Sequence, residues 1–299
     1  MANRVCLFAY HSNDLLLAPH TRHLLQQISS CGYELHIALS GILPHENDKL
    51  NSLHKSFLSA STPIHAQLYP RANQGLDFGA WRDLLQLNIA SQAEEILFAN
   101  DSVFGPLTPL KPIVDRMSAL NPHVWGMVRS EAITQHLQSW FLVMKREALF
   151  HPKIQAVFQQ PFHSMSKDEI VLHGELGLGL AMQAANFDLT ASWASNRGLA
   201  RLLSLNPMHT DWTTVLHSGK APFIKTELLR DNPSGIASTR FWKKEIPDTA
   251  FFNPLWIEEY LLKNPPRAVK KKAGFRARCV QALASEDRLA SLFHLFFKH

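Results

Sequence analysis

The feature of this sequence that most constrains its fold is a regular alternation between short apolar runs and amphipathic stretches in its first third. Residues 4–10, 34–40, 64–69 and 95–99 have the composition and length of buried strands. Between these runs apolar residues recur at helical spacing: Leu24, Leu25 and Ile28, then Leu50, Leu53 and Phe57, then Trp81, Leu84, Leu85 and Ile89. The resulting β-α-β-α-β-α-β order predicts an α/β fold with a Rossmann-like, mostly parallel sheet flanked by helices.

The pattern becomes less regular in the second half of the chain. Three further runs have the composition of strands: residues 124–128, 139–144 and 189–193. Residues 168–185 predict a long helix that begins with acidic residues, which the helix dipole favours at that end. After about residue 195 only short helical pieces are expected, at residues 211–217 and 255–262. The C-terminal part is therefore predicted to be irregular.

The C-terminal end is set apart by its charge. Between residues 263 and 278 the chain has seven basic residues and no acidic one, and a Pro-Pro pair marks a boundary. We therefore expect a core of residues 1–230, an extension of residues 231–264 packed on the core, and a basic amphipathic tail of residues 265–299. The tail either contacts an anionic membrane surface or docks on the core as a helix. Its apolar positions include Val280, Leu283, Leu289, Leu292 and Phe296.

The composition excludes several classes of protein. A hydrophobic content of 46% and a charged content of 18% are ordinary for a globular domain. No apolar run approaches the roughly 18 residues that cross a bilayer, and the apolar stretch at residues 5–10 is too short for a signal peptide. We therefore expect a cytoplasmic protein, peripheral at most on the inner face of the cytoplasmic membrane. The basic excess is confined to the tail, so no nucleic-acid partner is expected.

Polar residues follow the predicted strands, which is where ligands bind in parallel sheets. Asn13 and Asp14 follow the first strand, and Asn100, Asp101 and Ser102 follow the fourth. A carboxylate at the latter place can bind a divalent cation, which neutralises a nucleotide diphosphate as it leaves. The alternative is that Asp101 only opens the turn before a Gly-Pro pair.

A second polar segment, residues 73–81, places two glycines around an acid directly before an amphipathic helix. Gly75 permits close approach of the backbone to a ligand, and the helix N-terminus offers N–H donors to phosphate or sugar hydroxyls. Asn73 and Asp77 lie beside this glycine. The alternative is a connecting turn with Asp77 as the helix N-cap. Both interpretations place Asp77 at the start of the helix.

Glu175 is the candidate general base. It lies in a glycine-rich stretch, residues 174–179, that does not match the dinucleotide-binding pattern and falls within a helical segment. We expect the glycines to allow close packing. We also expect an apolar neighbourhood to raise the pKa of Glu175, which would suit removal of a proton from an acceptor hydroxyl. Asp168 and Glu169 are alternatives, but acids at a helix start usually serve the helix dipole.

Four segments occur in order along the chain: residues 73–84 (NQGLDFGAWRDL), 96–107 (ILFANDSVFGPL), 125–144 (WGMVRSEAITQHLQSWFLVM) and 221–229 (APFIKTELL). Together they resemble the rhamnan synthesis protein F family. The resemblance implies a GT-A-like glycosyltransferase that builds a bacterial surface polysaccharide. The implied donor is a nucleotide-sugar similar to dTDP-rhamnose, and the implied acceptor is a glycan or lipid-linked glycan. Transfer would proceed by inverting single displacement.

The resemblance also implies roles for individual residues. GT-A enzymes carry a metal-binding D-x-D motif at the place of Asn100-Asp101-Ser102, so either Asp101 binds Mg²⁺ or Mn²⁺ or the donor is held without a metal. The implied catalytic residues are Glu175, as the base, and Asp101. The implied donor site comprises Asn13, Asp14, Asn73, Gly75, Asp77, Asn100, Asp101, Ser102 and Lys225. The implied acceptor site comprises Trp125, Ser130, His136 and Trp140.

The asparagine at position 100 leaves a second function open. A protein that keeps the transferase fold but has lost turnover would act as a non-catalytic scaffold of polysaccharide assembly. A nucleoside diphosphate that binds only the folded protein must raise its thermal stability. A scaffold without a nucleotide site would show no such shift.

Overall fold

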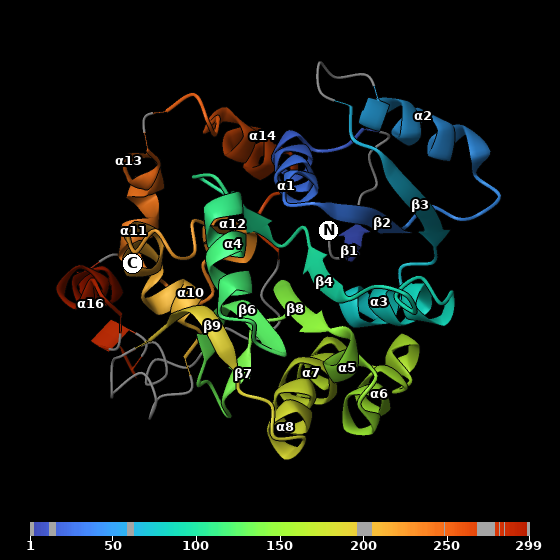
Figure 1. Ribbon diagram of the computed structural model, residues 1–299. Helices are drawn as coiled ribbons and strands as arrows, with labels where there is room; N and C mark the ends of the chain where they lie inside the picture. Colours follow the sequence, from blue (N-terminus) through green and yellow to red (C-terminus); the bar gives the residue numbers. More distant parts are fainter. Residues whose placement is uncertain are drawn as a thin grey trace.

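The computed structural model describes residues 3–11, 16–58, 63–195, 205–247, 249–267, 279–280, 282–283 and 285–297. These residues form a large central sheet with helices on both of its faces (Figure 1). The predicted α/β class and the mostly parallel sheet are confirmed.

The first half of the sheet follows the predicted alternation closely. Its elements, in chain order, are β1 (Arg4–His11), α1 (Pro19–Ser30), β2 (Tyr33–Ser40), α2 (Asn47–Leu58), β3 (Ala66–Arg71), α3 (Leu76–Gln86) and β4 (Glu95–Asn100). Strand β1 pairs in parallel with β2 and β4, and β2 pairs in parallel with β3. The carboxyl ends of these four strands therefore meet at one edge of the sheet.

The second half of the sheet contains the strand predicted at residues 139–144, whose antiparallel direction the sequence pattern did not reveal. The elements are β5 (Val103–Phe104), α4 (Lys111–Ala119), β6 (Val124–Ser130), β7 (His136–Leu137), β8 (Phe141–Lys145), α5 (Arg146–Leu149), α6 (Pro152–Phe158), α7 (Lys167–Ile170), α8 (Gly177–Ala184) and β9 (Thr190–Ala194). Strand β8 lies between β4 and β6 and runs antiparallel to both, while β9 extends the sheet parallel to β6. Between α7 and α8, Val171–Leu176 forms a π-helical turn that contains Glu175.

Alternate residues of the central strands enter two separate cores. On one face, Phe8 and Tyr10 of β1 pack with apolar residues of α1, α2 and α4. On the other face, Leu7 and Ala9 pack with α3, α5, α6 and α8. This alternation explains why β1 reads as a continuous apolar run, since both of its faces are covered.

A third apolar cluster joins the C-terminal extension to the core. The cluster takes residues from α11 (Trp212–His217), β10 (Ile224–Lys225), α12 (Thr226–Arg230), α13 (Trp242–Glu245) and α14 (Leu255–Lys263). The same part of the chain also contains α10 (Pro207–Thr210) and a 3-10 helix at Ala237–Phe241. Phe104 and Leu107 of the core pack there with Leu228 and Ile257. This cluster contains residues on both sides of position 230, so the extension packs directly against the core at the predicted boundary.

The described part of the tail docks on the extension. Glu286 accepts hydrogen bonds from the Thr213 and Thr214 amides at 2.8 and 2.9 Å, and Asp287 accepts one from the Ser238 amide at 2.8 Å. Helix α16 (Arg288–Phe297) follows and lies beside the extension (Figure 1). Residues 268–278, which hold most of the basic run, lie outside the described residues. Within the described part of the chain, no helix is both long and apolar enough to span a bilayer.

Candidate functional site

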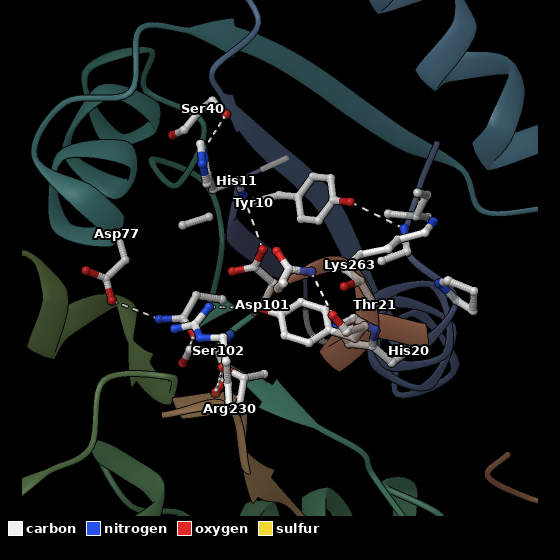
Figure 2. A pocket seen from close by; sticks show the side chains of 18 of the residues that line it. Tyr10, His11, His20, Thr21, Ser40, Asp77, Asp101, Ser102, Arg230 and Lys263 are labelled. Carbon is white, nitrogen blue, oxygen red and sulfur yellow. Dashed lines mark hydrogen bonds between the residues drawn. The ribbon is translucent and has the colours of Figure 1, made fainter. Parts of the chain in front are cut away.

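A cavity of about 1220 Å³ opens at the carboxyl ends of β1, β2 and β4. Its strand-end wall contains His11, Ser40 and Asp101, and the start of α3 contributes Asp77 (Figure 2). The opposite wall comes from the first turn of α1 and from α14, which carries Tyr260. Parallel strands end together at this edge, so the fold itself creates the opening between their loops.

Asn100, the last residue of β4, links the end of this strand to the start of α3. Its side-chain amide donates to Asp77 Oδ2 at 2.8 Å, and its Oδ1 accepts from the Ser102 amide and hydroxyl at 3.1 and 2.6 Å. An aspartate at position 100 would have no proton to donate to Asp77 while both were ionised. The asparagine that breaks the D-x-D pattern therefore fits this network better than an acid does.

Asp101 directly follows β4 and is one of the carboxylates that line the cavity. Burial raises its pKa to about 6, against the lowering effects of the His11 amide, which donates to Oδ2 at 3.3 Å, and of the His11 side chain. The negative charge of Asp77 raises the pKa further. Burial also raises the pKa of Asp77, with Glu175 adding to the effect.

Lys225 reaches this network from a distant part of the chain. Strand β10 pairs antiparallel with β5, which sets Lys225 opposite Val103. Its Nζ lies 3.4 Å from Ser102 Oγ and 5.6 Å from the centre of the Trp140 ring. Burial lowers the pKa of Lys225, while Glu175, Glu227 and Asp77 raise it. The fold therefore places the ammonium group of Lys225 beside the Asn100-Asp101-Ser102 segment, as the resemblance implied.

The cavity also contains basic side chains that the sequence did not predict as site residues. Lys167, Arg230, Lys263 and Arg267 all line it. Arg230 is held by Asp231 at 3.0 Å and by the Tyr260 hydroxyl at 3.2 Å. Lys263 and Arg267 belong to the basic run near the C-terminus, whereas Lys167 and Arg230 gave no sequence signal. All four come from outside the strand-end loops that the sequence indicated.

Glu175 differs from our expectation. Burial alone would raise its pKa, but hydrogen bonding and charge from His136, followed by Lys225 and Ser139, lower it to about 2. The His136 Nε2 atom lies 3.4 Å from Glu175 Oε1, and the Ser139 amide and hydroxyl donate to Oε2 at 2.8 and 2.5 Å. The expected apolar neighbourhood and raised pKa are wrong, because three donors surround this carboxylate.

The glycines around Glu175 serve packing, as expected. A Cβ added to Gly174 would lie 2.9 Å from the Phe78 ring, and one added to Gly179 would lie 2.7 Å from His136 Cβ. The glycine at position 75 also packs against the protein itself. An added Cβ there would lie 2.9 Å from the Cα of Gly79, and Gly75 does not line the cavity. Its proposed ligand contact is therefore replaced by a contact within the fold.

The residues predicted to bind an acceptor do not form an open surface. Trp125 and Trp140 are each 1% exposed and belong to the core, so neither offers a ring face to a sugar. Ser130 is 2% exposed and its hydroxyl accepts from the Ala132 amide, while His136 is 3% exposed and holds Glu175. Trp125 lies in β6 and Trp140 directly precedes β8, and aromatic side chains at such positions favour the core of a sheet, which sequence spacing did not show.

The other predicted donor residues divide into two groups. Asn73, Asp77, Asn100, Asp101 and Ser102 line the cavity together. Asn13 and Asp14 lie outside the described residues. Asp77 lies in the first turn of α3, as both sequence interpretations required, although Gly75 rather than Asp77 is the N-cap.

The described residues contain no group of three or more His, Cys, Asp or Glu side chains arranged to hold a metal ion. A divalent cation at Asp101 would need further oxygen ligands, either from neighbouring groups of the protein or from bound molecules. Basic side chains already approach the same space, from Lys225 at Ser102 and from Arg230. Lysine and arginine side chains at this place can neutralise phosphate groups.

A comparison with protein families agrees with the sequence resemblance. A family model described as rhamnan synthesis protein F matches residues 45–298. Two sequences of Virulence protein VirA from Vibrio anguillarum are 27% identical over 214 residues, covering 61% of this chain and 68% of the relative. The solved structure of mannosyltransferase PcManGT from Pyrobaculum calidifontis, in complex with GDP-Man and Mn²⁺, aligns over 100% of this chain and 89% of its own, with a TM-score of 0.41 and 12% identity.

Proposed function

This chain belongs to the rhamnan synthesis protein F family, and from that membership we propose that it is a glycosyltransferase of polysaccharide synthesis. The substrate is a nucleotide-activated hexose, with rhamnose as the first donor to test, and the acceptor is a growing glycan. The observation that carries the proposal is the cavity at the strand ends, where Asp101 and the Asn100 network meet Lys225 and Arg230.

The cavity suits a nucleotide-sugar in size and in charge. Its volume of about 1220 Å³ exceeds that of a typical drug-sized site, roughly 300–1,000 Å³. Asp101 and Asp77 can accept hydrogen bonds from sugar or ribose hydroxyls. Lys225 and Arg230 can contact the diphosphate, because both side chains approach the side of the cavity that contains Ser102.

The reaction that we propose is a single displacement. An acceptor hydroxyl oxygen forms a bond to the anomeric carbon, and the bond from that carbon to the phosphate oxygen breaks. The electron pair leaves with the nucleoside diphosphate, whose growing negative charge Lys225 stabilises. Configuration at the anomeric carbon inverts because the attack and the departure occur on opposite faces.

Glu175 is our candidate for the base that removes the proton from the acceptor hydroxyl. Its hydrogen-bond contacts determine how readily it can accept that proton. In this structure the donors on Glu175 hold its pKa at about 2, which makes it a weak proton acceptor. An acceptor hydroxyl that displaced Ser139 or His136 would remove hydrogen bonds that lower the pKa. Burial, which raises the pKa, would remain. Acceptor binding and activation of the base would then be linked.

The decisive experiment incubates the intact chain with a panel of nucleotide-sugars and glycan acceptors and follows transfer and hydrolysis by mass spectrometry. We expect one donor to be consumed by the native chain and not by Asp101→Asn. Thermal shifts with nucleoside diphosphates, with and without Mg²⁺ or Mn²⁺, run alongside. If no nucleoside diphosphate raises the Tm and no donor is consumed, the non-catalytic scaffold is favoured and a nucleotide site is rejected.

A further inference from the structure

The wall of the cavity opposite the strand ends contains the N-terminus of helix α1, which has 12 residues. The N-cap residue is Ala18, whose side chain cannot cap the helix, and Pro19 occupies the first turn. The first bond back into this turn is made by the Arg22 amide, which donates to the Ala18 carbonyl at 2.9 Å. Among the described residues, the amides of His20 and Thr21 have no acceptor. Free N–H groups at a helix start favour a negatively charged ligand.

Two side chains of the same turn add an independent observation. His20 is 2% exposed and Thr21 is 1% exposed, and both line the cavity. His20 Nδ1 and Thr21 Oγ1 are buried without a hydrogen-bond partner among the described residues. A buried polar atom without a partner costs roughly 1–3 kcal/mol, so two in one turn require an explanation. A ligand that accepts hydrogen bonds would satisfy both.

The surrounding charges favour an anion. Lys263 and Arg230 line the same cavity, and Figure 2 places the labelled Lys263 next to Thr21 and His20. The opposing carboxylates at the cavity are Asp101, whose pKa burial raises to about 6, Asp77, whose pKa burial also raises, and Glu259 of α14. Burial lowers the pKa of His20 to about 4, so its imidazole is neutral at pH 7 and can donate one hydrogen bond.

We propose that the first turn of α1, with His20, Thr21 and Lys263, is a second phosphate-binding subsite that takes a phosphate ester carried by the acceptor. This proposal rests on the proposed glycosyl transfer and deepens it. The donor diphosphate occupies the side of the cavity that contains Ser102 and Lys225. The acceptor then enters with its phosphate on the α1 side, which turns its free hydroxyl toward the donor sugar. Such an acceptor is a phosphorylated or lipid-phosphate-linked glycan.

Isothermal titration of the full chain with inorganic phosphate tests the subsite, and two variants locate it. Thr21→Val keeps the shape of the side chain and removes its hydroxyl. His20→Phe keeps a ring against Phe104 and Tyr260, which lie 5.1 and 5.0 Å away between ring centres, and removes both nitrogens. We expect each variant to bind phosphate roughly tenfold or more weakly, as loss of a hydrogen bond to a charged group predicts. Lys220→Gln, an exposed lysine away from the cavity, is the control and should bind normally.

A second titration separates the two possible sources of phosphate. Phosphate is added to the chain already saturated with the nucleoside diphosphate of its donor. Binding that persists supports a separate acceptor subsite, whereas competition would assign the α1 turn to the donor and overturn the proposal. Unchanged phosphate affinity in both variants would also overturn it. Nucleoside diphosphate binding is measured in the same series, so a failure of the donor site is seen separately.

Discussion

Two buried carboxylates of the site have opposite pKa shifts. Burial raises the pKa of Asp101 to about 6, since a backbone amide at 3.3 Å and the His11 side chain offset it only in part. Glu175 is also buried, yet its pKa falls to about 2 because His136, Lys225 and Ser139 outweigh burial. The number of donors around each carboxylate therefore decides its proton affinity. The spacing of residues in the sequence does not show which donors surround each carboxylate.

Asp101→Asn should separate stability from activity. The pKa of Asp101 in the folded protein is above its ordinary value, so its contribution to stability is complete below the unfolded pKa of about 4 and is lost as the pH rises through about 6. The variant cannot ionise. We therefore expect the Tm of the variant, relative to that of the native chain, to rise between pH 4 and pH 7, while transfer falls. The corresponding gain in the free energy of unfolding is at most roughly 1.4 kcal/mol for each unit by which the pKa of Asp101 is raised. A Tm difference that stays constant across this range would contradict the burial of the charge.

His136→Phe should change the pH dependence of transfer. The substitution removes the Nε2 contact with Glu175 at 3.4 Å, and with it the largest of the effects that lower the pKa of this carboxyl. The pKa of Glu175 should rise, so the acidic limb of the kcat/KM profile should move to higher pH. His123→Phe is the matched control, since His123 pairs with Glu147 at 3.2 Å on the surface. An unmoved acidic limb would mean that Glu175 is not the base.

At the scale of elements, the short pairing of β5 with β10 does the most to assemble the site. It consists of two residue pairs, Ile224 with Phe104 and Lys225 with Val103. Gly105 follows β5 with φ of 130°, and the Leu107 amide donates to the Pro222 carbonyl at 2.8 Å. These contacts hold the segment before Lys225 against the segment after Asp101.

Gly105→Ala should therefore damage the site through the backbone. An added Cβ would lie 2.7 Å from the Pro222 carbonyl oxygen and 2.8 Å from the Phe223 ring. We expect a loss of stability of roughly 1–3 kcal/mol together with weaker nucleoside diphosphate binding. Gly219→Ala is the control, because Gly219 also has positive φ, at 66°, but an added Cβ there meets nothing within 4 Å. Equal effects of the two substitutions on binding would reject the assembly role.

At the scale of the whole molecule, the chain returns from its C-terminal third to complete the cavity. Arg267, at the start of the tail, contacts Asp231 at 2.6 Å and Glu227 at 3.0 Å, which ties this part of the tail to α12 and its C-cap beside the site. Glu286 then ties the described part of the tail to α11. The described part of the predicted tail is therefore docked on the protein. Contact of the tail with a membrane stays a prediction.

Glu286→Gln should lower the Tm of the intact chain. The carboxylate accepts from the Thr213 amide at 2.8 Å, and from the Thr214 amide and hydroxyl at 2.9 and 2.7 Å. Loss of the charge weakens these bonds, and we expect a cost of roughly 1–3 kcal/mol in chemical unfolding. Glu94→Gln, at an exposed position away from the tail, is the control. A stability equal to that of the native chain would show that this docking contributes little.

Leu289→Glu tests the membrane interpretation without removing the tail. Leu289 of α16 is 85% exposed, so the substitution should leave the Tm unchanged. If α16 rests on a membrane surface, the variant should co-sediment less than the native chain with vesicles of anionic phospholipid. Leu262→Glu provides a control at another exposed leucine, 87% exposed on α14. Equal sedimentation of all three proteins would remove the membrane contact.

The sequence by itself determined the α/β class, the order of the first seven elements and the place of Asp77 and Asp101 at strand ends. These follow from local periodicity, because each strand and helix is encoded by neighbouring residues. Only the tertiary structure decided that Trp125 and Trp140 are core residues and that Glu175 has a lowered pKa. It also decided that Lys225 lies beside Ser102 and that Arg230 lines the cavity. The bond from Lys225 to Ser102 joins positions 123 residues apart. Such contacts depend on how the sheet and the C-terminal extension pack together, which local spacing does not encode.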